Sequence, residues 1–197
     1  MRFSKAAALG IFTVMSYTVA AQTPENATGT VEKSMFYVQI GGVGGWVGHE
    51  ARLAAKWTLR TEVGLDLFGN TYEQENGNDV TKYSMAPTLN IEPRWYYNIE
   101  KRAKKGKVTA NNCANFFGLS FKYAPDTFVL ASDDRSNVPN QLIVAPRWAI
   151  RRHIGKNFNY ELGAYAGYNF VFQNRSGNPD NNSQVVVDIH ARIGYSF

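Results

Sequence analysis

Three histidines are the side chains with the clearest catalytic potential in this sequence of 197 residues: His49, His153 and His190. A hydrolase or acyltransferase needs a histidine that a carboxylate orients and, in most cases, a serine beside it. Asp188 and His190 share one face of any strand that contains both, because side chains alternate along a strand. Ser196 lies too far along the same segment to complete a compact triad unaided. We therefore predict no catalytic residues, and a lipid hydrolase or acyltransferase stays an alternative.

No cofactor and no metal site is predicted. The histidines are scattered without the spacing of metal ligands, and no glycine-rich turn precedes a helix as a phosphate site requires. Cys113 is the single cysteine, so it cannot form an intramolecular disulfide. A net charge of +5 is also too small for a nucleic-acid-binding surface. We expect no nucleic acid among the partners.

A basic run in the middle of the chain has two interpretations. Its cations are Lys101, Arg102, Lys104, Lys105 and Lys107. Such a run can bind anionic lipid head groups or a polymer, because each cation near a charged surface contributes ~1 kcal/mol. It can equally be a solvated connection between two elements.

The remaining ionisable residues occur at alternate positions of long segments. Apolar and polar residues alternate from Leu53 to Leu67, from Tyr83 to Tyr97, from Phe158 to Phe172 and from Val185 to Phe197. Each segment is therefore a strand with one apolar and one charged face. Soluble strands typically run ~5–6 residues, whereas a tilted strand needs ~9–11 residues to cross a bilayer. The sequence thus predicts an all-β protein without helices, a transmembrane antiparallel up-and-down β-barrel.

We expect eight strands, near residues 34–41, 46–54, 57–68, 81–98, 113–131, 140–152, 157–172 and 184–197. The first hairpin depends on a turn in the glycine-rich residues 41–45. A single bent strand over residues 34–52 would instead leave seven. Parity favours eight, since bacterial barrels of this kind use even numbers of strands.

The N-terminus predicts export. Arg2 and Lys5 precede an apolar stretch, and small residues end at Ala21, as in a cleaved signal peptide. We divide the chain into a signal peptide (residues 1–21), an N-terminal periplasmic segment (22–33) and a barrel (34–197). Only closed barrels satisfy every backbone group of strands in lipid, so we expect an integral protein of the bacterial outer membrane.

The last strand carries a family resemblance. Ile193, Tyr195 and the terminal Phe197 alternate with smaller or polar residues. This pattern resembles the C-terminal assembly signal of outer-membrane β-barrel proteins, and the chain as a whole resembles small, uncharacterised bacterial barrels of the eight-stranded type. The resemblance implies insertion by the barrel-assembly machinery and contact with outer-membrane lipids. It leaves open the physiological role, and any ligand of the outer loops is unknown.

The charged faces must point into the barrel. Eight strands leave an interior that side chains fill, so opposite charges have to pair. The predicted lumen network is Glu50, Arg52, Arg60, Glu62, Asp66, Glu92, Arg94, Arg147, Glu161, Asp188, His190 and Arg192. We expect it to plug the lumen of a non-enzymatic protein whose outer loops serve surface interaction or membrane integrity. A narrow porin-like pore is the alternative.

Trp57, Trp95 and Trp148 are predicted to form an aromatic girdle at the periplasmic boundary. The polar connections near residues 69–80, 132–139 and 173–183 would then lie on the outer side. The basic run of residues 101–107 would lie in a periplasmic turn.

Overall fold

The computed structural model describes residues 29–73, 79–126, 130–131, 138–155, 157–172 and 183–197. The predicted signal peptide lies outside these residues, and so do residues 74–78, 132–137 and 173–182 of the predicted outer loops. The expectation that the connection begins at residue 69 was wrong, because residues 69–73 and 79–80 pair with each other and extend the two flanking strands. The strands are β1 (Ser34–Gly41), β2 (Gly44–Ala54), β3 (Trp57–Glu73), β4 (Asp79–Trp95), β5 (Asn115–Ala124), β6 (Leu130–Ala131), β7 (Gln141–Ile154), β8 (Phe158–Val171) and β9 (Gln184–Ser196).

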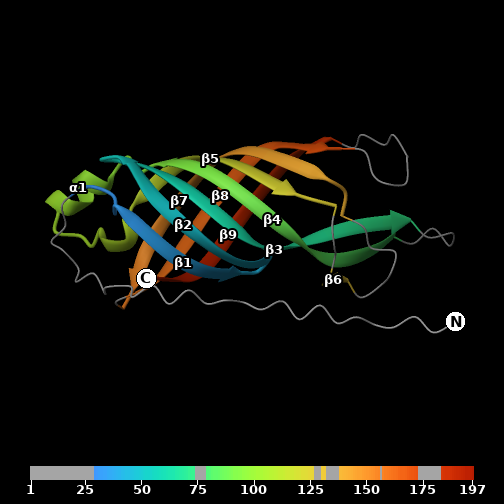
Figure 1. Cartoon of the computed structure of the whole chain (residues 1–197), viewed down its shortest axis with the longest axis horizontal. Coiled ribbons are helices and arrows are strands. Elements are labelled where there is room, and N and C mark those ends of the chain that lie inside the picture. Colours follow the sequence, from blue (N-terminus) through green and yellow to red (C-terminus); the bar gives the residue numbers. More distant parts are fainter. Residues whose placement is uncertain (1–28, 74–78, 127–129, 132–137, 156, 173–182) are drawn as a thin grey trace, which may run out of the picture.

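These strands form a closed antiparallel barrel (Figure 1). The hydrogen-bonded order is β3-β2-β1-β9-β8-β7-β5-β4, and the pairing of β3 with β4 closes the ring. The two-residue β6 pairs with β4, as β5 does, and adds no position to the ring. The predicted eight-stranded antiparallel barrel is therefore confirmed.

The first hairpin resolves the choice between seven and eight strands. Gly41 pairs with Gly44 at the end of β1 and β2, so a two-residue turn connects them. Gly44 has a φ of +152°, and a Cβ there would lie 2.0 Å from the carbonyl oxygen of Leu65. Only glycine fits this close approach of two backbones.

Alternation along the strands places charge inside and apolar side chains outside. Arg60, Glu92 and Arg94 have no exposed surface, whereas Trp57 and Trp95 on the same strands are 46% and 40% exposed. Large apolar residues are exposed all around the barrel, including Phe36, Val47, Val63, Ile91, Phe121, Leu162 and Ile189. The barrel is thus the inverse of a soluble protein, which buries such residues.

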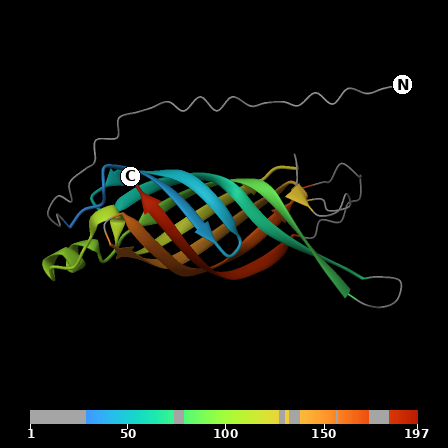
Figure 2. The same ribbon diagram turned by 90° about the horizontal axis from the view of Figure 1, so that it is seen from below.

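The two ends of the barrel differ (Figures 1 and 2). One end carries the start of β1, the C-terminus, and the helices α1 (Ile99–Lys104) and η1 (Ala110–Asn112). At the other end, β3 and β4 extend beyond the neighbouring strands. Among the described residues, no helix has the length and hydropathy needed to span a membrane.

The expectation of a chain without helices was wrong for the basic run. Ile99 is fully buried at the barrel end and anchors the first turn of α1. Glu100 pairs with Lys104 one turn later, at 2.8 Å, and with Lys56 of the β2–β3 turn, at 2.7 Å. These hydrogen bonds, first that from Lys104, lower the pKa of Glu100 to about 2. Strand periodicity carries no information about such a tertiary anchor.

Candidate functional site

Glu161 of β8 is the centre of the charged interior. Its carboxylate accepts hydrogen bonds from Arg94 of β4 at 3.1 and 3.3 Å and from Arg151 of β7 at 2.9 and 3.2 Å. Arg60 of β3 donates to the same carboxylate at 3.2 Å, and Nε2 of His190 lies 3.3 Å from it. One fully buried carboxylate therefore holds three guanidinium groups from three other strands.

Glu50 and Glu62 extend the network toward β1 and β2. Glu50 accepts from Arg151 at 3.0 Å and also from Tyr96 at 2.7 Å. Glu62 pairs with Arg60 and accepts from Arg192 of β9, whose Nη1 lies 3.0 Å from both carboxylate oxygens. Every one of these carboxylates is buried, so each needs its cation.

Glu92 of β4 and Asp66 of β3 are two further carboxylates in the interior. Glu92 accepts from Arg94 at 3.0 Å and from Arg147 at 3.1 Å. Asp66 accepts from Lys122 at 2.8 Å and from the indole nitrogen of Trp46 at 3.0 Å. The charged network thus follows the barrel axis through several layers of side chains.

Aromatic rings fill the space around the guanidinium groups. Arg192 lies 3.8 Å from the ring centroid of Trp46, and Arg60 lies 4.2 Å from that of Tyr37. Arg94 lies 4.1 Å from the ring of Phe116. Such stacking stabilises a buried cation and excludes water from its faces.

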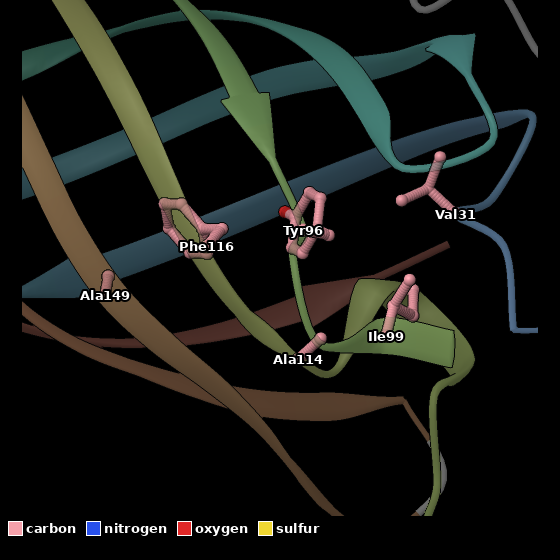
Figure 3. Packing of buried hydrophobic residues seen from close by; sticks show 6 residues of the cluster. All are labelled: Val31, Tyr96, Ile99, Ala114, Phe116 and Ala149. Carbon is pink, nitrogen blue, oxygen red and sulfur yellow. The ribbon is translucent and has the colours of Figure 1, made fainter. Parts of the chain in front are cut away.

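Apolar clusters lie at both ends of this network. At the α1 end, the buried side chains of Val31, Tyr96, Ile99, Ala114, Phe116 and Ala149 gather between the strands and α1 (Figure 3). Near the other end, Ala86, Ala124 and Val138 form a second buried cluster, against which Phe68 packs.

Inward-facing glycines provide room for the large charged side chains. A Cβ on Gly118 of β5 would lie 2.4 Å from Oε1 of Glu92. The interior therefore alternates small and large residues, as in other small barrels.

The structure brings most of the predicted lumen residues into one network. Arg52 and Asp188 lie apart from it: both are only partly buried, Arg52 donates to the carbonyl oxygen of Val31, and Asp188 accepts from Tyr165 at 3.2 Å. The connected residues are Glu50, Arg60, Glu62, Asp66, Glu92, Arg94, Arg147, Glu161, His190 and Arg192, with Arg151 and Lys122 in addition.

Several uncharged members of the network were missed by sequence reasoning. Tyr37 donates to Glu62 at 3.2 Å, and Asn112 donates to Glu50 at 2.9 Å. Tyr96 lies two residues after the inward-facing Arg94, so alternation along the strand indicated that it also points inward. Asn112 reaches Glu50 from η1 through the left-handed backbone of Asn111 and Asn112, and no strand pattern predicts that.

The residues considered for catalysis do not meet. His190 contacts Glu161 rather than Asp188, and Ser196 accepts a hydrogen bond from Asn159 at 2.9 Å. His49 lies 2.7 Å from the hydroxyl of Ser34 on the exposed side of β2, with no carboxylate among its contacts in the described residues. In the same part of the chain, no group of three metal-ligating side chains occurs.

The three predicted girdle residues lie on the outer surface at the α1 end. Trp57 and Trp95 stack with ring centroids 6.0 Å apart, and Phe117 stacks on Trp95 at 6.4 Å. Tyr97 accepts a hydrogen bond from the indole nitrogen of Trp148 at 3.1 Å and so connects β4 with β7. Aromatic side chains at one level of a barrel are typical of a membrane boundary.

Comparisons with known proteins add little to this description. No family model matches the chain, and no curated protein sequence matches it. Among solved structures, the chain is similar to a major outer membrane protein from Thermus thermophilus, at 15% identity and a TM-score of 0.40, over 84% of this chain and 100% of that one. A similarity of this size does not establish a family.

Proposed function

We propose that this protein is an integral outer-membrane β-barrel whose interior side chains close the bore and which has no enzymatic activity. The observation that carries the proposal is the inverted distribution of side chains, with ion pairs inside and large apolar residues outside. In water, such a surface would aggregate. In lipid it is favourable, and the closed ring satisfies the backbone of every strand.

The height of the apolar surface supports a membrane-spanning role. Aromatic residues mark both ends of β8 on its outer side, with Phe158 near the α1 end and Tyr168 toward the other. Ten residues at ~3.3 Å each, tilted by ~40°, give a band about 25 Å tall. That height matches the apolar band of outer-membrane barrels.

Ion pairs across the full bore support a closed interior. Arg60 and Glu161 lie on strands four positions apart in the ring, and so do Glu50 and Arg151. An ion would have to separate fully buried ion pairs, which is costly. The protein then serves membrane integrity or presents its outer loops, rather than transporting solutes.

The test is reconstitution of the purified protein. A folded sample should give a β-type circular dichroism spectrum, migrate differently on electrophoresis before and after boiling, and insert into lipid vesicles. In planar bilayers it should be silent or show small, rare events. Stable, ion-selective channels would instead favour the porin-like alternative, and acyl release from labelled lipid that His190→Ala abolishes would favour the hydrolase.

A further inference from the structure

Two arginines meet on the outer side of the barrel at the α1 end. Arg152 of β7 has the same parity as the outward-facing Trp148, and its strand partner on β8 is Tyr160. Arg102 lies in α1, close enough to Arg152 that repulsion from it, after the effect of burial, lowers the pKa of Arg102. Both side chains are partly exposed.

The segment from Val108 to the first residue of β5, Asn115, fixes both guanidinium groups. Arg102 donates from Nε to the carbonyl oxygen of Cys113 at 2.8 Å and from Nη2 to that of Val108 at 3.1 Å. Arg152 donates from Nη2 to Oδ1 of Asn115 at 2.6 Å. Only Ala114, which lies in a bend, separates Cys113 from Asn115. Both cations are therefore held by the same short segment of the chain before any ligand arrives.

Neither arginine has an anionic partner among the described residues. The ion pairs in that part of the chain do not include Arg102 or Arg152, and the nearby Glu100 is already paired with Lys56 and Lys104. Two adjacent cations without a counter-ion repel each other, and a shared anion removes that repulsion.

The position of the pair indicates which anion is available. Asn115, which binds Arg152, also donates to the hydroxyl of Tyr97 at 3.1 Å, and Tyr97 accepts from Trp148. The arginines thus adjoin the aromatic girdle, the level at which lipid head groups lie. We propose that Arg102 and Arg152 together bind the phosphate of an anionic phospholipid in the periplasmic leaflet. This inference rests on the proposed function, because it needs the girdle to lie at a membrane boundary.

Native mass spectrometry of the folded protein in detergent tests the proposal. Phosphatidylglycerol and phosphatidylcholine are titrated separately against the wild-type protein, the double variant Arg102→Gln/Arg152→Gln and the control Lys101→Gln/Lys105→Gln. The control removes the same charge from exposed residues close to the arginines. The wild-type protein should prefer phosphatidylglycerol, and each lost arginine should weaken that preference about fivefold. The lysine control should keep most of it.

Equal binding of both lipids by the wild-type protein would overturn the proposal, and so would a lysine control that loses as much as the arginine variant. Displacement of the lipid by millimolar inorganic phosphate would also contradict it, because the site would then be a free-phosphate site. If the double variant does not fold, the same titration is made with two single variants. Arg152→Gln removes one cation and leaves the hydrogen bonds of Arg102 intact, and Arg152→Lys restores the positive charge at that position. The lipid titration uses only protein that is folded, as its shift in electrophoretic migration on boiling shows. Failure of this folded protein to insert into vesicles would therefore refute the proposed function separately from the lipid site.

Discussion

Arg60 of β3 and Glu161 of β8 lie on opposite strands of the barrel, yet their side chains meet with Nη1 and Oε2 3.2 Å apart. Both residues are fully buried. The pair therefore crosses the whole bore, and Arg94 and Arg151 reach the same carboxylate from two further strands. The interior of this barrel is a three-dimensional network of charges that couples the strands to one another.

Neutralising Glu161 should destabilise the folded barrel strongly. Glu161→Gln leaves three buried guanidinium groups without their shared anion, and such a loss typically costs ~3–5 kcal/mol. Glu100→Gln is the matched control, because its two lysine pairs lie at the surface, where an ion pair typically contributes at most ~1 kcal/mol. Thermal unfolding followed by the electrophoretic shift should show a large decrease for the first variant and a small one for the second. Equal decreases would mean that the interior charges do not determine stability.

Adding one methyl group at Gly118 should disturb the network from the strand side. The Cβ of Gly118→Ala would lie 2.4 Å from Oε1 of Glu92, which Arg94 and Arg147 hold in place. Overpacking of this kind typically costs ~1–3 kcal/mol. The control is Gly42→Ala, where a Cβ meets no atom within 4 Å. Urea unfolding of the two variants compares the free energies, and unchanged stability of Gly118→Ala would show that the interior tolerates added volume.

The orientation in the membrane can be tested with single cysteines. Cys113 is buried, and burial raises the pKa of its thiol to about 11, so it should react slowly; Cys113→Ser removes it altogether. In that background, Gly106→Cys beside α1 should resist an impermeant thiol reagent on intact cells, whereas Val43→Cys in the β1–β2 turn should react. The reverse pattern would place α1 outside the cell.

Acid should release α1 from the barrel end. The pKa of Glu100 is lowered from 4.5 to about 2 in the folded state, first by the hydrogen bond from Lys104 and then by that from Lys56. A lowered pKa means that the charged form stabilises the fold above pH 4.5, and this contribution is lost as the pH falls toward 2. Carboxyl resonances in NMR should show a midpoint near 2 for Glu100, and Lys104→Gln should raise it. A midpoint near 4.5 in the wild-type protein would show that the two pairs do not form in solution.

The sequence by itself determined the strands and the face that each one turns inward. Period-2 alternation is a local property, so the parity of Arg60, Glu92 and Glu161 could be read without knowledge of the fold. Strand length and the even number of strands in bacterial barrels also predicted eight strands. Whether residues 34–52 form one strand or a hairpin was open in the sequence. The close approach of Gly44 to the backbone of Leu65, which only glycine allows, belongs to the tertiary structure.

Tertiary structure alone decided which charges meet. Parity says that Glu161 points inward, but its partners Arg60 and Arg94 depend on the closure of the ring and the stagger of its strands. The same holds for Asn112, which reaches Glu50 from η1, and for Arg102 and Arg152, which the chain before β5 brings together. These contacts join residues far apart in the sequence, and alternation, which relates only neighbours along one strand, carries no information about them.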